Sequence, residues 1–163
     1  MGDALARAAY AQLVAESDRL YRRITSARRR IRICFTMCPR PYSGAEELIT
    51  SIRRDRVVEV VAAARDRDRR HPLMGCEIGG AYDRFRGVHD VLGHGLLGVG
   101  FDRGGEYAAW RCQEHHHSAL ARRALATELH AEHSFRWTTG ELPDHKAVVL
   151  DERLIEASRR GAA

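Results

Sequence analysis

The stretch Ala81-Tyr-Asp-Arg-Phe-Arg-Gly-Val-His-Asp-Val-Leu-Gly-His-Gly-Leu-Leu97 has apolar residues at helical spacing, so we predict one helix over these residues. Its two histidines, His89 and His94, are five residues apart. Five residues of a regular helix turn about 500°, which would leave the two rings roughly 140° apart. A local distortion is needed to bring the rings together. Gly93 and Gly95 favour one, and a one-residue π-bulge would align positions five apart.

Further helices are expected on the carboxyl-terminal side of this stretch. A glycine-rich segment, Gly98 to Gly105, leads into a predicted helix over Glu106 to Ser118. A second helix is predicted over Ala119 to Phe135. After a loop at Thr138 to Pro143, we expect a closing helix over Val148 to Arg159.

On the amino-terminal side, apolar residues at helical spacing predict an amphipathic helix from Ala4 to about Arg28. Alternating residues predict a strand over Ile31 to Thr36. Ser43 offers a cap for a short helix running toward Arg53. The valine-rich segment Arg56 to Ala62 fits a second strand or a helix, and the strand interpretation gives a small two-stranded ribbon. The charged residues Arg65 to Arg70, followed by His71, indicate an exposed connection.

The composition bounds the class of protein. With 163 residues, 44% hydrophobic and 30% charged, the chain has the size and composition of one soluble, compact domain. No apolar run approaches the roughly 20 residues of a membrane span. Residues Met1 to Ala15 lack the apolar block of a signal peptide, and the four cysteines lack zinc-knuckle spacing, so we expect a reduced, cytoplasmic protein. The predicted fold class is α+β, mostly helical, as a single domain over residues 1–163.

The net charge of +5 raises the possibility of a nucleic-acid partner. Arginines cluster between Arg22 and Arg32, but Lys146 is the only lysine of the chain. Such one-sided usage indicates a compositional bias, and the cluster has no interleaved aromatic residues on which bases could stack. Both features disfavour nucleic-acid binding.

The residues predicted to bind a metal are His89, His94 and Glu128. Glu128 falls on the apolar stripe of its helix, where a lone carboxylate is costly and a cation is the simplest compensation. Two histidines and one carboxylate form the arrangement that leaves open positions on Fe(II) for oxygen and substrate. The alternatives are an ordinary ion pair of Glu128 with Arg86, Arg122 or Arg123, and histidines that are merely packed or solvated. The five-residue spacing disfavours a zinc protease, which needs four.

Two resemblances accompany these motifs. The string His89-Asp-Val-Leu-Gly-His94 resembles the His-Glu-Leu-Leu-Gly-His signature of the pterin-dependent aromatic amino acid hydroxylases, in which two histidines and a downstream glutamate bind iron. The resemblance implies iron, with Glu128 as the glutamate. The resemblance does not imply that this chain binds pterin, because Asp90 replaces the glutamate that helps to hold pterin in the hydroxylases. The chain is also much shorter than a hydroxylase catalytic domain.

The second resemblance covers about a third of the chain. From Phe85 to about Ser134 the sequence is similar to a group of small, poorly characterised bacterial and phage proteins. They share the Phe-Arg, His-Asp and Gly-His start, a Gly-Glu-x-x-x-Trp segment matched by Gly105, Glu106 and Trp110, and a Thr-Glu element matched by Thr127 and Glu128. This resemblance implies no activity.

Asp90, Glu106 and Arg86 are the candidate catalytic residues. Glu106 could accept a hydrogen bond from a ligand imidazole, or could simply be a carboxylate favoured at a helix start. Arg86 could clamp a substrate carboxylate, or could pair with Asp90 one turn later. Phe85 and Trp110 could wall an aromatic pocket or belong to the core.

The other histidines have open roles. Glu114 and His117 form one Glu-x-x-His pair, whereas a di-iron helix bundle needs two. Consecutive residues on a helix point about 100° apart, so at most one of His115, His116 and His117 faces a site. His130 and His133 could support the site, form a pH-sensitive patch or be exposed.

Three functions remain open at this point. The first is a mononuclear Fe(II) oxygenase acting on a small molecule, such as an amino acid, with O2 as co-substrate. The second is a hydrolase that binds Zn(II) or Mn(II) through the same ligands, with Glu106 or Asp90 as base. The third is a non-enzymatic, arginine-rich module that binds a nucleic acid or a protein. A homodimer closing over the site is a further expectation, because a short chain has limited room for an enclosed cavity.

Overall fold

The structure is a computed structural model that describes residues 2–160. Met1 and residues 161–163 lie outside it. The predicted class is confirmed, because the chain is mostly helical with one small sheet. The elements are α1 (Gly2–Thr25), β1 (Arg32–Thr36), α2 (Ala45–Thr50), β2 (Val57–Val61), α3 (Ala81–His89), α4 (Arg103–Glu114), α5 (Ala119–Leu125), α6 (Glu132–Thr139) and α7 (Glu152–Arg160). π-Helical segments at Ser51–Asp55, Asp90–Gly95 and Ala126–Ala131 continue α2, α3 and α5.

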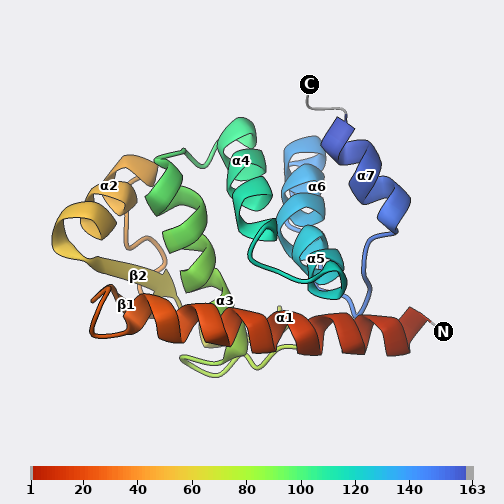
Figure 1. Cartoon of the computed structure of the whole chain (residues 1–163), viewed down its shortest axis with the longest axis horizontal. Coiled ribbons are helices and arrows are strands. Elements are labelled where there is room, and N and C mark those ends of the chain that lie inside the picture. The colour runs from red at the N-terminus through yellow and green to blue at the C-terminus, as the bar shows by residue number, and fades with distance from the viewer. Residues whose placement is uncertain (1, 161–163) are drawn as a thin grey trace.

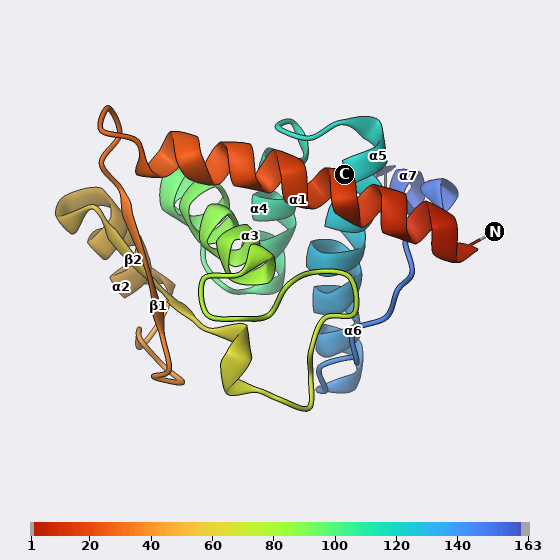
Figure 2. The ribbon, with the colours of Figure 1, turned by 90° about the horizontal axis from the view of Figure 1, so that it is seen from below.

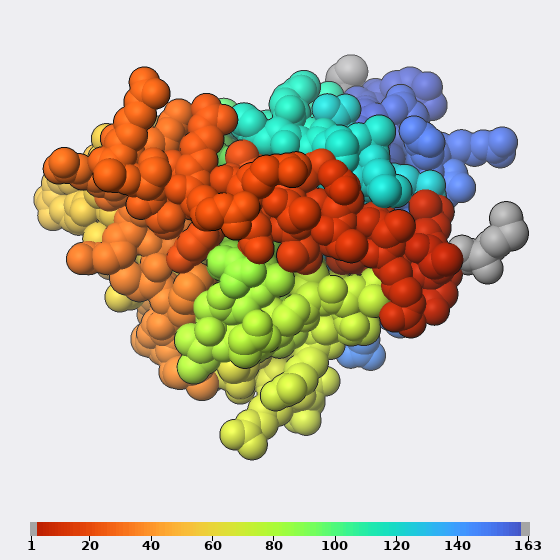
Figure 3. All heavy atoms as spheres, turned by 60° about the horizontal axis from the view of Figure 1, so that its bottom comes forward, coloured from red at the N-terminus to blue at the C-terminus, as the bar shows by residue number. Residues whose placement is uncertain are grey.

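Helix α1 runs horizontally along the molecule in Figure 1, with α4, α5, α6 and α7 above it. It buries one face, including Ala9, Tyr10 and Leu13. It ends at Thr25, before the predicted Arg28, because the amides of Arg29 and Arg30 turn back to the Ser26 carbonyl at 3.0 and 2.8 Å. Its opposite face lies on the molecular surface in Figure 3.

The two strands form a parallel pair in which Ile33 is opposite Val58. Parallel strands need a crossover, which α2 and the π-helical segment after it provide. Val58 and Val60 are buried at alternate positions, as in a strand. The strand interpretation of Arg56 to Ala62 is therefore correct, and the helix interpretation is wrong. The predicted cap of α2 is wrong by one residue. Gly44 holds that position, while the amide and hydroxyl of Ser43 donate to the Glu47 carboxylate, each at 2.8 Å.

Helices α5 and α6 form one nearly continuous rod through the π-helical segment between them, as predicted for Ala119 to Phe135. The rod extends to Thr139 and ends at Gly140, whose φ of 78° is left-handed. Helix α4 begins earlier than predicted, because the side chain of Asp102 caps it by accepting from the Gly105 amide at 3.0 Å. Helix α7 begins at Glu152 and not at Val148.

Two clusters of buried apolar residues fill the interior, and α1 and α3 contribute to both of them. One surrounds Trp110, Phe85 and Tyr10 between the helices, and the other lies under the sheet. The helices of residues 2–160 include none with the length and apolar character required to cross a membrane.

The segment between β2 and α3, yellow to light green in Figure 2, loops away from the sheet and returns to α3. Arg65 to Asp68 are exposed, as predicted, but His71 is buried. Arg69 donates to the carbonyls of Leu142 and Pro143 in the loop after α6. The segment is therefore hydrogen-bonded to the loop after α6, and His71 lies in the interior of the protein.

Candidate metal centre

The helix over Ala81 to Leu97 contains a π-helical turn where the five-residue spacing of the histidines predicts one. Residues Asp90–Gly95 form a π-helical turn, and the ring centroids of His89 and His94 lie 4.9 Å apart. Gly93 permits the packing around this turn. A Cβ atom there would lie 2.8 Å from Cβ of Ala109 in α4 and 3.2 Å from Nδ1 of His89. The glycine therefore lets α4 pack closely against the turn that carries both imidazoles.

The carboxylate that meets these two imidazoles belongs to Glu106, on the first turn of α4. Its Oε2 atom lies 3.5 Å from Nε2 of His89 and 3.4 Å from Nε2 of His94. All three side chains are buried, and their ligand atoms lie within 4.8 Å of one another. Metal bonds of about 2.1 Å at tetrahedral to octahedral angles separate neighbouring ligand atoms by roughly 3.0–3.4 Å. The two separations from Oε2 of Glu106 lie at or just above this range, so the three atoms could hold one small divalent cation.

The other ring nitrogens of the two histidines are held by hydrogen bonds. Nδ1 of His94 lies 3.1 Å from the Val99 carbonyl oxygen, which can only accept, so Nδ1 carries the proton. Nδ1 of His89 lies 2.9 Å from Oε1 of Gln113, which fixes its tautomer in the same way. In the neutral imidazoles both Nε2 atoms therefore present lone pairs toward Glu106, as metal-binding histidines do.

The centre favours positive charge. Burial opposes ionisation of Glu106, but His89 and His94 outweigh it and hold its pKa well below the usual range. Burial also acts to lower the pKa of His94, yet the contact with Glu106 raises that pKa above its ordinary value. Nε2 of His89 is buried and has no hydrogen-bond partner. A proton or a metal cation placed between Oε2 of Glu106 and the Nε2 atoms of His89 and His94 would give these buried atoms a partner.

All three residues line a cavity of about 420 Å³. Its walls also include Phe85, Phe101 and several arginines and acids, namely Arg65, Asp66, Arg69, Arg86, Asp90, Glu128, Glu132 and Arg136. Glu106 and His133 line a neighbouring hollow of about 620 Å³ beside Trp137 as well. These two cavities give a small molecule room next to the three side chains.

Glu128 does not join the two histidines in this group. It is buried, as expected, but its neighbours are Tyr10, His71 and His145. The Tyr10 hydroxyl donates to Oε1 of Glu128, and Nε2 of His71 lies 3.2 Å from the same oxygen. The expected trio is thus corrected: Tyr10 and His71 are the partners of Oε1 of Glu128, and Glu106 is the acid that faces His89 and His94.

The alternative ion pairs of Glu128 do not form either. Within residues 2–160, no arginine nitrogen lies within 4.0 Å of its carboxylate. Arg122 donates to the Glu114 carbonyl and Arg123 to the Leu150 carbonyl. Arg86 donates to the Val61 carbonyl at 2.7 Å and lies over the ring of Tyr82.

Arg86 and Asp90, two candidate catalytic residues, both line the cavity. They do not pair with each other within 4.0 Å in the described part of the chain. Burial raises the pKa of Asp90, although His89 and Arg86 act in the opposite direction. Phe85 also lines the cavity, whereas Trp110 lies in the core.

The remaining histidines divide between surface, packing and the centre. His115 and His116 are exposed, and His117 is buried against Glu16 at 3.1 Å. Glu114 pairs with Arg159, so the Glu-x-x-His pair forms no shared site. His130 stacks on Trp110 with centroids 4.4 Å apart. Nδ1 of His133 lies 3.4 Å from Oε2 of Glu106, which places it at the edge of the centre.

Sequence reasoning missed Gln113 and the carbonyl of Val99 as partners of the imidazoles. A signal for Gln113 was present, because Glu106, Ala109, Trp110 and Gln113 form one stripe of α4 at helical spacing. Polar residues at both ends of a buried stripe need partners, and both lie against His89: Gln113 is next to Nδ1 at 2.9 Å, and Glu106 faces Nε2 at 3.5 Å.

Comparisons with models of protein families, with curated proteins and with solved structures find no match to this chain. The resemblances in the sequence remain expectations.

Proposed function

We propose that the protein is a mononuclear metal enzyme that binds Fe(II) through His89, His94 and Glu106 and uses O2 to oxidise a small molecule. One observation carries this proposal. Two imidazoles with their Nδ1 protons engaged elsewhere direct both Nε2 atoms at one buried carboxylate oxygen, at 3.5 and 3.4 Å. Two histidines and one carboxylate are the ligand set of non-haem Fe(II) oxygenases, because it leaves positions open for oxygen and substrate.

The protein's own residues would supply binding and orientation. Gln113 and Val99 hold the two rings, so the ligand atoms are in place before any metal arrives. The cavity provides a binding place for a small molecule beside the ligands, and Arg86 offers a guanidinium to an anionic group. The iron, when bound, would supply the oxygen chemistry.

The test is anaerobic reconstitution with Fe(II), followed by exposure to nitric oxide as a probe for an open coordination position. We expect about one bound iron per chain and the EPR signal of a high-spin iron nitrosyl. Glu106→Ala should lose both the iron and the signal. Failure of the wild type to retain iron, or a bound iron that gives no nitrosyl, would contradict the proposal.

A second candidate function is favoured by Glu132, which lines the same cavity. Burial and the charge of Glu128 raise the pKa of Glu132 to about 7, which suits a general base at neutral pH. With Zn(II) or Mn(II) on the same ligands, this carboxylate could activate water for hydrolysis. Hydrolytic turnover that proceeds without oxygen and is lost in Glu132→Gln would favour the hydrolase over the oxygenase.

A further inference from the structure

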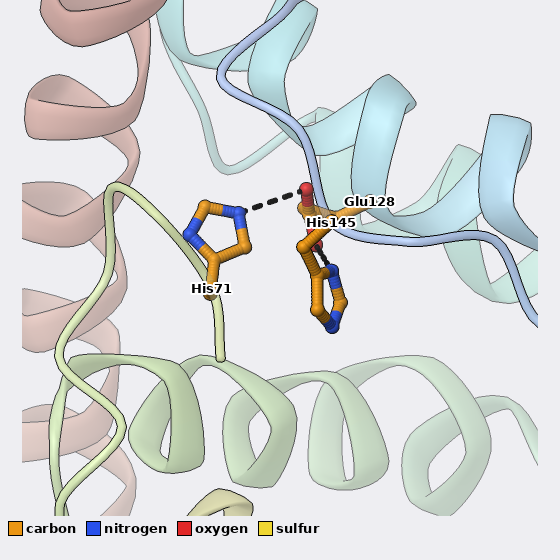
Figure 4. A group of neighbouring side chains, drawn as sticks. All are labelled: His71, Glu128 and His145. Carbon is orange, nitrogen blue, oxygen red and sulfur yellow. Dashed lines mark hydrogen bonds and ion pairs between the residues drawn. The ribbon is translucent and has the colours of Figure 1, made fainter. Parts of the chain in front are cut away.

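A second group of histidine and glutamate side chains, His71, Glu128 and His145, has ligand atoms within 4.8 Å of one another. Figure 4 shows His71 and His145 on either side of the Glu128 carboxylate, each contributed by a loop. By distance alone it resembles the centre formed by His89, His94 and Glu106. The hydrogen bonds behind the rings distinguish the two groups.

His71 has no lone pair free for a metal. The backbone amides of Leu73 and Met74 donate to its Nδ1 atom at 3.0 and 2.9 Å, so Nδ1 is unprotonated. The proton of the neutral ring is therefore on Nε2, which faces Oε1 of Glu128 at 3.2 Å. Nε2 of His71 is therefore a donor, whereas Nε2 of His89 and Nε2 of His94 present lone pairs.

The two oxygens of Glu128 are treated differently. Oε1 accepts from both the Tyr10 hydroxyl and His71. Oε2 is buried and has no hydrogen-bond partner, and its neighbour, Nδ1 of His145, is 3.7 Å away. A buried carboxylate oxygen without a donor is costly. Its side chain is only 5% exposed, so bulk water does not offset this cost.

Glu128 and His145 line the cavity that also contains His89, His94 and Glu106, whereas His71 lies behind Glu128 and does not line it. The arginines of the cavity wall do not reach the Glu128 carboxylate within 4.0 Å, as far as residues 2–160 are concerned. Glu132 lines the same cavity and adds a second acid. This part of the wall therefore offers acceptors to a ligand and has no cation of its own in contact with them.

We propose that Oε2 of Glu128 binds the ammonium group of a primary amine held in the cavity beside the metal ligands. Such a group brings a positive charge and up to three N–H donors, which match a buried carboxylate oxygen. As a statement about the substrate class, the inference rests on the proposed function. The binding of the amine itself involves Glu128 and needs no metal.

The experiment uses n-butylamine and its neutral counterpart n-butanol as probes, observed by saturation-transfer NMR on metal-free and Zn(II)-loaded full-length protein. We expect the wild type to bind the amine at least tenfold more tightly than the alcohol, with or without metal. Equal binding of amine and alcohol, or binding of neither, would overturn the inference.

Glu128→Gln is the informative variant, because the amide oxygen can still accept from Tyr10 and His71 while the charged oxygen is lost. We expect about tenfold or greater weakening of amine binding and unchanged metal content. Glu141→Gln, in an exposed loop, is the matched control and should bind like the wild type. A second equivalent of Zn(II) that disappears in Glu128→Gln would show a metal site there instead and would overturn the inference.

These measurements separate the two proposals. Amine binding by a protein that takes up no metal would refute the proposed function and leave the role of Glu128 standing. Metal uptake without preference for the amine would do the reverse. If Glu128→Gln does not fold, the comparison of amine and alcohol on the wild type decides the matter alone.

Discussion

Gln113 lies behind His89: its Oε1 atom is 2.9 Å from Nδ1 of His89, while the other ring nitrogen faces Glu106. This contact fixes the tautomer and the orientation of the ring. Gln113→Leu should therefore weaken metal affinity by roughly 10–100-fold, as removal of such partners does in other metal proteins.

The affinity is measured by competition with a chromophoric chelator. Gln113→Glu keeps an acceptor at the same place and serves as the control, with affinity close to that of the wild type. Equal metal affinities of Gln113→Leu and the wild type would show that Gln113 does not orient His89 for metal binding.

Position 93 must be glycine because α4 packs closely against the π-helical turn there. A Cβ atom there would lie 2.8 Å from Cβ of Ala109, and neither the helix turn nor α4 can yield easily. Gly93→Ala should lower the free energy of unfolding by about 1–3 kcal/mol and should also weaken metal binding. Urea denaturation measures the first effect.

Gly44→Ala is the control for that substitution, because a Cβ atom there meets nothing within 4 Å. Gly44 holds the N-cap of α2, where Ala is a poorer cap than Gly, so we expect a loss of about 0.5 kcal/mol, smaller than that of Gly93→Ala. The double variant Gly93→Ala, Ala109→Gly should recover part of the loss if the contact with Ala109 is its cause.

Glu16 links α1 to the start of α5. Its Oε2 atom accepts from the Ser118 amide at 3.0 Å and lies 3.1 Å from Nδ1 of His117. Burial acts to raise the pKa of Glu16, but the hydrogen bonds from Gln12 and Ser118 outweigh it, and the pKa is lowered. A lowered carboxyl pKa contributes stability above its ordinary value and loses it as the pH falls.

Glu16→Gln should therefore be less stable than the wild type at pH 7, by about 1–3 kcal/mol. The difference should shrink as the pH falls below about 4.5, where the wild-type carboxylate takes up its proton. Urea denaturation at both pH values checks this, and a difference that does not change with pH would contradict it.

Glu132 makes the stability of the fold depend on pH in the opposite direction. Burial, with the charge of Glu128, raises its pKa from 4.5 to about 7. The folded protein then holds a proton that the unfolded chain releases, so stability is lost as the pH rises from 4.5 through 7. Glu132→Gln should be more stable than the wild type at pH 8 and similar to it at pH 4.5. Thermal unfolding at the two pH values measures this, and equal stabilities at pH 8 would refute it.

The π-helical turn and its two histidines could be predicted from sequence because the information is local. The five-residue spacing needs an extra residue in the turn, and Gly93 and Gly95 make that turn possible. The helical class and the strand over Ile31 to Thr36 follow from local patterns in the same way.

The acid that faces the two histidines could not be decided locally. Glu106 and Glu128 both lie on the apolar stripe of a helix, and both need compensation. Oε1 of Glu128 receives it from Tyr10 and His71, which are 118 and 57 residues away along the chain. Only the packing of α1 and the segment before α3 brings those groups to it, and no spacing in the sequence records that packing.

We propose that His89, His94 and Glu106 bind one divalent cation. The metal content of desalted protein after anaerobic loading with Fe(II), compared between the wild type, Glu106→Gln and Glu128→Gln, tests this binding. We predict about one iron per chain in the wild type and in Glu128→Gln, and at least a tenfold loss in Glu106→Gln. Iron that survives in Glu106→Gln but disappears in Glu128→Gln, or a wild type that binds none, would contradict the account.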